Sequence, residues 1–152
     1  MKHITVLLLL FSVIFLSACS SSTPSADQDA GAVTSLLVSG GDIQVSYTRS
    51  DLEALPTTQA VFNNVTYEGV SVAELLQEAG FDLGEIRAVK AVAVDGYSVN
   101  YDTSQVLAAD VIVAYARADG ELAEDDGTFR MVLPTAEGKL NVRMLVELQI
   151  LP

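Results

Sequence analysis

The chain has 152 residues, with 20 acidic and 8 basic side chains and a formal net charge of −12. This balance argues against nucleic acid as a partner and against adsorption to anionic lipid headgroups. The only histidine, His3, and the only cysteine, Cys19, both lie close to the N-terminus. The rest of the chain therefore lacks the side chains for histidine acid/base catalysis, for Ser-His-Asp or Cys-His nucleophiles, and for zinc or copper ligation by His or Cys.

The N-terminus has the pattern of an export signal. A basic start at residues 1–3 precedes an apolar run over residues 4–15 that is interrupted by Thr5 and Ser12. This run is shorter than the ~20 residues that a spanning helix requires. Leu16-Ser17-Ala18-Cys19 then resembles the lipobox of bacterial lipoproteins, in which the chain is cut before the cysteine. We therefore predict a signal peptide over residues 1–18; the alternative is cleavage by the ordinary peptidase, which would leave a free thiol.

The lipobox resemblance implies that Cys19 carries acyl chains such as palmitate and anchors the protein to a membrane. Each buried methylene of such a chain contributes about 0.8 kcal/mol, so two or three chains hold firmly. Residues 19–32 are rich in Ser, Ala and Asp and are predicted to be a polar tether. Ser20 is not the Asp that commonly retains lipoproteins at the inner membrane. The expected location is thus the cell envelope, on the periplasmic face of the outer membrane if the host has two membranes.

Residues 33–152 are predicted to form one domain of short elements. Two capping boxes, at residues 48–51 and 71–74, open helices over 50–55 and 72–79, which Pro56 and Gly80 end. A further helical turn is predicted over 103–107. The remaining segments with alternating or continuous apolar character are predicted strands: residues 34–38, 43–47, 57–63, 65–67, 86–94, 97–101, 111–116, 129–133 and 145–151. Many strands with two short helices predict an α+β domain with a mixed sheet or a flattened barrel.

Several motifs, in this order and spacing, resemble the oxidoreductase molybdopterin-binding family, whose members have the sulfite oxidase fold. The resemblance covers about residues 47–152. The motifs are Thr48-x-x-Asp51-Leu52-x-x-Leu55-Pro56, Tyr67-x-Gly69-Val70-x-Val72-x-x-Leu75-Leu76-x-x-Ala79-Gly80, Val94-Asp95-Gly96-Tyr97-Ser98-Val99, Val111-Ile112-Val113-Ala114-Tyr115, Asp119-Gly120-Glu121-Leu122, Asp126-Gly127-x-Phe129-Arg130-Met131-Val132-Leu133-Pro134 and Val142-Arg143-Met144.

The chain departs from this family where its enzymes carry the cysteine thiolate that binds molybdenum. That cysteine stands between the first helix and the Tyr-x-Gly-Val motif, and here this segment is only residues 57–66, without cysteine or histidine. Asn63 or Thr57 cannot replace a soft thiolate for this metal. The resemblance therefore predicts the fold of this family without its catalytic activity, and we expect that the protein is not an enzyme.

Three basic residues, Arg130, Lys139 and Arg143, lie close together in an otherwise acidic chain. The resemblance implies that this stretch lies along the pterin cofactor site. Arg can hold a phosphate or a planar heterocycle, so the three side chains are candidate ligand contacts. The alternative is that each forms an ion pair with a neighbouring carboxylate, such as Glu137 or Glu147.

Asp95 and Tyr97 flank Gly96 in a predicted hairpin turn. A carboxylate and a phenol on one loop could hydrogen-bond a pterin-like ring, although both residue types are also common in turns for structural reasons. The acidic run at residues 124–126 does not have the spacing of an EF-hand loop, so no metal site is predicted.

Together these patterns predict a non-catalytic, membrane-tethered domain that binds a pterin or another small planar or anionic ligand outside the cytoplasm, without molybdenum. The alternative is a structural lipoprotein with the same fold and no ligand, which presents a strand or loop to a partner protein of the envelope. An enclosed pocket at Arg130, Tyr97 and Arg143 would favour the first hypothesis, and a groove filled by side chains the second.

Overall fold

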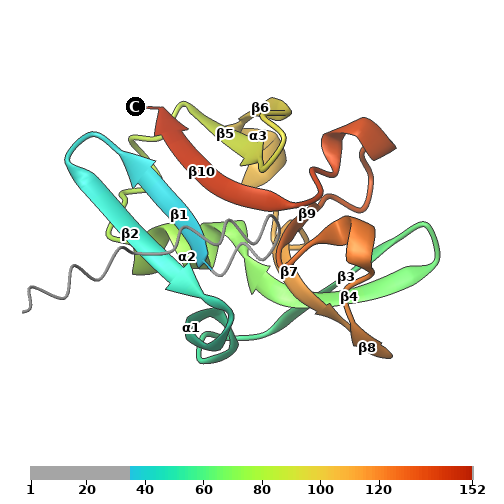
Figure 1. Cartoon of the computed structure of the whole chain (residues 1–152). Coiled ribbons are helices and arrows are strands. Elements are labelled where there is room, and N and C mark those ends of the chain that lie inside the picture. Colours follow the sequence, from blue (N-terminus) through green and yellow to red (C-terminus); the bar gives the residue numbers. More distant parts are fainter. Residues whose placement is uncertain (1–34, 152) are drawn as a thin grey trace, which may run out of the picture.

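The computed structural model describes residues 35–151, whose strands form two sheets (Figure 1). The first sheet has the strand order β2-β1-β10-β5-β6. Its strands are β1 Ser35–Gly40, β2 Ile43–Thr48, β5 Ala88–Ala93, β6 Ser98–Asp102 and β10 Leu145–Leu151. β1 and β10 run parallel and the other neighbours run antiparallel, so the predicted mixed sheet is confirmed. The predicted signal peptide, the tether and Cys19 lie outside the described residues.

The second sheet is antiparallel, with the order β3-β4-β7-β8 and with β9 paired to β7. Its strands are β3 Thr58–Phe62, β4 Val65–Ser71, β7 Ile112–Arg117, β8 Gly120–Glu121 and β9 Arg130–Val132. β4 and β7 approach closely at Gly69, where a Cβ atom would lie 2.0 Å from the carbonyl oxygen of Val113. The domain thus consists of two sheets rather than one closed barrel.

The helices are short, and there are three rather than the two expected. They are α1 Arg49–Glu53, α2 Val72–Glu78 and α3 Thr103–Val106, and two 3-10 turns follow at Glu124–Asp126 (η1) and Gly138–Leu140 (η2). α3 forms at the predicted helical turn because the Asp102 carboxylate caps it by accepting from the amide of Gln105. Thr48 and Asp51 form the expected capping box at α1, and the Ser71 hydroxyl caps α2.

The main core brings the two sheets and α2 together, and Figure 1 shows α2 running across the middle of the molecule. Leu75 and Leu76 of α2 are fully buried in it, since both fall on the apolar face of this helix. A smaller apolar cluster covers the other face of the second sheet and includes Tyr67 and Val132. Among residues 35–151, no helix is long and apolar enough to cross a membrane.

Alternation along β9 decides where its side chains go. Met131 belongs to the main core, whereas Val132 belongs to the smaller cluster on the opposite face. Successive residues of a strand point to opposite faces, so Arg130 lies on the same face as Val132. This places a guanidinium group on the outer face of the second sheet, where the candidate site lies.

Candidate functional site

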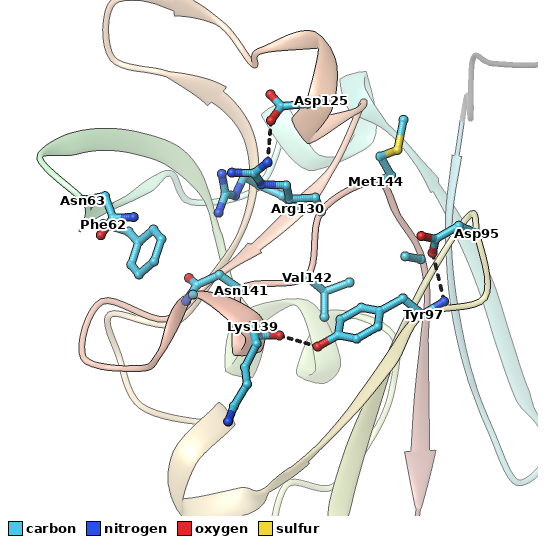
Figure 2. Close-up of a pocket in the computed structure, with 13 residues that line it drawn as sticks. Phe62, Asn63, Asp95, Tyr97, Asp125, Arg130, Lys139, Asn141, Val142 and Met144 are labelled. Carbon is cyan, nitrogen blue, oxygen red and sulfur yellow. Dashed lines mark hydrogen bonds and ion pairs between the residues drawn. The ribbon is translucent and has the colours of Figure 1, made fainter.

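A hollow of about 530 Å³, open to solvent on one side, lies where the end of β3, the β5–β6 turn, the start of β9 and the segment before β10 meet. All five residues predicted as ligand contacts line it (Figure 2): Asp95, Tyr97, Arg130, Lys139 and Arg143. Its other lining residues are Phe62, Asn63, Ala93, Asp125, Gly138, Asn141, Val142 and Met144.

Arg130 forms the buried base of this site. Its residue surface is only 2% exposed, and its Nη1 donates to Asp126 Oδ1 at 2.5 Å and to the hydroxyl of Tyr67 at 2.9 Å. The guanidinium carbon lies 4.6 Å from the centre of the Tyr67 ring and 5.9 Å from that of Phe62. Cation–π contacts and a charged hydrogen bond therefore hold this guanidinium in one position.

Asp126 is the partner that makes the burial of Arg130 tolerable. Its side chain is 5% exposed and lies at the end of η1, where its carbonyl oxygen accepts from the amide of Met144. The same carboxylate oxygen also lies 3.4 Å from Nε of Arg143. A buried charge without such a partner would cost several kcal/mol.

Nε of Arg130 makes no hydrogen bond within the described part of the chain, although the atom is buried. Buried polar groups in folded proteins nearly always have a partner, and among the described residues the Nε of Arg117 is a second exception.

Lys139 and Arg143 lie on the exposed rim. Lys139 Nζ lies 2.8 Å from Glu137, and their hydrogen bond raises the pKa of Lys139 and lowers that of Glu137. Arg143 pairs with Asp125, and both belong to the lining of the hollow. The sequence-based alternative of ion pairs is thus seen for every member of the cluster, although Glu147 is not one of the partners, because it accepts from Ser39 at 2.7 Å instead.

Asp95 and Tyr97 form the turn that was predicted. Gly96 has a φ of +83°, which suits glycine, and Asp95 Oδ1 accepts from the amide of Tyr97 at 2.9 Å. The Tyr97 hydroxyl donates to the carbonyl oxygen of Lys139 at 2.7 Å, which links this hairpin to η2. Its ring remains 46% exposed and forms one wall of the hollow.

Sequence analysis did not predict several residues of the hollow as contacts. Phe62 and Asn63 come from the β3–β4 turn, where Asn63 has a φ of +49°. Asn141 is 4% exposed, and its side-chain oxygen accepts from the amide of Leu133 at 2.7 Å. The asparagine turn was visible in the sequence, but nothing there showed that it would face Arg130.

The hollow does not supply a conventional metal site. Residues 35–151 contain no cysteine and no histidine, and none of their Asp and Glu side chains form a group of three that could hold a metal ion. Asp125 and Asp126 are both engaged by arginines. What the geometry provides is aromatic walls, a buried guanidinium group and peptide edges, which are the features of a binding site for a small planar molecule.

Comparison with known proteins identifies the family. Residues 32–152 match the model described as the oxidoreductase molybdopterin binding domain, and the chain belongs to that family. The crystal structure of the sulfane dehydrogenase SoxCD from Paracoccus pantotrophus is similar, with a TM-score of 0.64 and 22% sequence identity over 76% of this chain. The match covers 37% of the SoxCD chain, so it shows the shared fold alone. No curated protein matches the sequence.

The family name implies a pterin cofactor that carries molybdenum. The residues of the hollow can be compared with the metal and with the pterin ring separately. A soft thiolate ligand for the metal is missing from the segment 57–66, whose residues Phe62 and Asn63 face the hollow. The residues present therefore do not fit a thiolate-bound molybdenum. A pterin ring has the size and the hydrogen-bonding edge that the hollow can accept.

Proposed function

We propose that the protein is a non-catalytic, membrane-tethered domain that binds a pterin-like or other small planar or anionic ligand outside the cytoplasm. One observation carries the proposal: a single hollow is lined by the five predicted contact residues, with the buried guanidinium group of Arg130 at its base. The volume of about 530 Å³ lies within the usual range for small-molecule sites.

The hollow offers each part of such a ligand a partner of matching chemistry. The guanidinium group of Arg130 belongs to the lining and can donate to a carbonyl oxygen or ring nitrogen at the edge of a heterocycle. The rings of Phe62 and Tyr97 lie on the lining and can contact its faces. Arg143 is 55% exposed at the rim and can turn toward a bound molecule.

The non-catalytic part of the proposal rests on the side chains at hand. The hollow contains carboxylates, cations, a phenol and amides, and no thiol or imidazole. The tether rests on the lipobox resemblance at Cys19, which would place the domain beside a membrane.

Binding can be tested directly with residues 33–152 and a panel of oxidised and reduced pterins, followed by fluorescence quenching or calorimetry. Arg143→Ala should weaken binding about tenfold, since a charged hydrogen bond contributes roughly 1.5–3 kcal/mol. Arg117→Ala is the matched control, because Arg117 pairs with Asp119 outside the hollow. If no pterin binds and native mass spectrometry of protein from its own host shows no bound small molecule, the proposal is wrong.

A second function is favoured by the ion pairs themselves. Each cation of the hollow already has a carboxylate partner, which is what a domain without a ligand would show. Under this alternative the domain is a structural or protein-interaction module of the envelope. A pull-down in which variants of the rim residues Lys139 and Arg143 lose a partner protein, while added pterins have no effect, would support this alternative over ligand binding.

A further inference from the structure

We infer that the hollow selects uncharged planar ligands and rejects phosphorylated ones, and that Asp125 and Glu137 set this selectivity. The inference rests on the proposed function and narrows its ligand class. It departs from the expectation that a basic cluster attracts anions, and it also separates this site from one built for a phosphate-bearing cofactor.

The first argument is the balance of charge at the hollow. Its three cations, Arg130, Lys139 and Arg143, are matched by three carboxylates in direct contact with them: Asp126, Glu137 and Asp125. Asp95 adds a fourth carboxylate to the lining, and its recorded hydrogen bond is to a backbone amide rather than to a cation. Counted with Asp126 and Glu137, which contact its cations without belonging to the lining, the hollow has four carboxylates to three cations.

The second argument is the charge of the domain around the hollow. Residues 35–151 contain 18 acidic and 7 basic side chains, a formal balance of −11. The long-range potential that such a domain creates opposes the approach of an anion, and no excess of positive charge at the hollow compensates for it. A phosphate monoester, with close to two negative charges, is repelled more than its parent alcohol.

The third argument concerns hydrogen-bond donors. Strong phosphate sites direct several charged or backbone donors at one group. Here Nη1 of Arg130 is used by Asp126 and Tyr67, while Lys139 and Arg143 are paired with Glu137 and Asp125. A phosphate would have to break these ion pairs of Arg143 or Lys139 to gather several charged donors.

The remaining lining suits the faces of a ring. Met144, which is 39% exposed, contributes apolar surface beside the rings of Phe62 and Tyr97, whereas Ala93 and Val142 are almost fully buried. Burial of a planar heterocycle against this surface stabilises binding without any charge on the ligand. The site thus combines apolar and aromatic surface with cations that already have carboxylate partners.

The test compares 6-hydroxymethylpterin with its monophosphate ester, which differ only by the phosphate. The alcohol should bind roughly five- to tenfold more tightly to residues 33–152, because a dianion faces the net negative site at a distance of several ångströms. Raising the salt concentration to ~0.5 M should reduce this difference, since screening weakens repulsion. In a positively charged pocket, salt would instead weaken binding of the phosphate ester.

Two variants test the named carboxylates. Asp125→Asn and Glu137→Gln, at side chains that are 65% and 74% exposed, should each release a rim cation and narrow the preference for the alcohol severalfold. Asp119→Asn is the matched control: it removes the same charge from a similarly exposed carboxylate, 76%, in an ion pair outside the hollow, and should change the preference little.

The outcomes separate the two levels of the argument. If the phosphate ester binds as tightly as the alcohol or more tightly, the selectivity is refuted and pterin binding itself stands. If the two carboxylate variants behave like Asp119→Asn, then Asp125 and Glu137 are not its determinants. If neither molecule binds, the proposed function fails and the inference fails with it.

Discussion

Replacing Arg130 by Met should destabilise the domain by about 3 kcal/mol. The change leaves the Asp126 carboxylate, 5% exposed, without its main partner, and removal of one member of a buried ion pair costs ~3–5 kcal/mol. The lower end of this range applies because Nε of Arg143 still lies 3.4 Å from the same carboxylate. Met keeps much of the volume between Phe62 and Tyr67, so little of the loss comes from a cavity.

Urea unfolding of residues 33–152 measures this loss as a lower transition midpoint at an unchanged slope. Arg117→Met is the control, since its pair with Asp119 is partly exposed and should contribute less than about 1 kcal/mol. Arg130→Met combined with Asp126→Leu should recover most of the stability, because no uncompensated charge remains buried. If Arg130→Met costs no more than the control, or if the double variant is no more stable than the single one, the structural role assigned to the pair is refuted.

Four further outcomes are expected. Leu75→Ala and Leu76→Ala, at fully buried positions of α2, should each lower the free energy of unfolding by about 2–5 kcal/mol, and an unchanged urea midpoint would contradict the packing of this helix. Gly69→Ala should cost at least about 1–3 kcal/mol in the same assay, because its new Cβ atom would lie 2.0 Å from a carbonyl oxygen of β7. Hydrogen bonds from Thr48, the N-cap residue of α1, lower the pKa of Asp51. The contribution of the Asp51 carboxylate to the stability of α1 is therefore present above the ordinary Asp pKa and is lost as the pH falls through the lowered value. An NMR titration of this carboxyl group checks the prediction, and a midpoint at or above the ordinary Asp pKa would refute it. Cys19→Ser should abolish palmitate labelling and membrane association in cell fractionation, and continued labelling would show that the lipid is attached elsewhere.

The fold could be predicted from local signals because most of its elements have local causes. The hairpin turns at Gly41 and Gly96 follow from glycines that accept positive φ, and the second of them formed where it was expected. The capping residues placed the starts of α1 and α2 to within one residue. The choice between a mixed sheet and a flattened barrel could not be made from the sequence, because strand order depends on long-range pairing such as that of β1 with β10.

The lining of the site was only partly predictable. Arg130, Lys139 and Arg143 could be grouped because they are close in sequence, and the turn at Asp95 brought Tyr97 with it. Phe62 reaches the hollow from the β3–β4 turn, far away in sequence, and no local pattern marks such a contact. Amphipathic spacing predicts which face of an element is buried, and not which distant element covers it.

The sign of the charge at the site also depends on contacts that a local sequence pattern does not show. A count along the chain finds three cations in a short stretch and predicts a positive patch. In the folded domain Arg143 meets Asp125, 18 positions earlier in the chain, while Arg130 lies over Asp126 in a buried pair that also approaches Arg143. Each contact cancels a charge that the count had included. A basic cluster can therefore line a hollow without making it positive, and the comparison of a pterin with its phosphate ester measures this property.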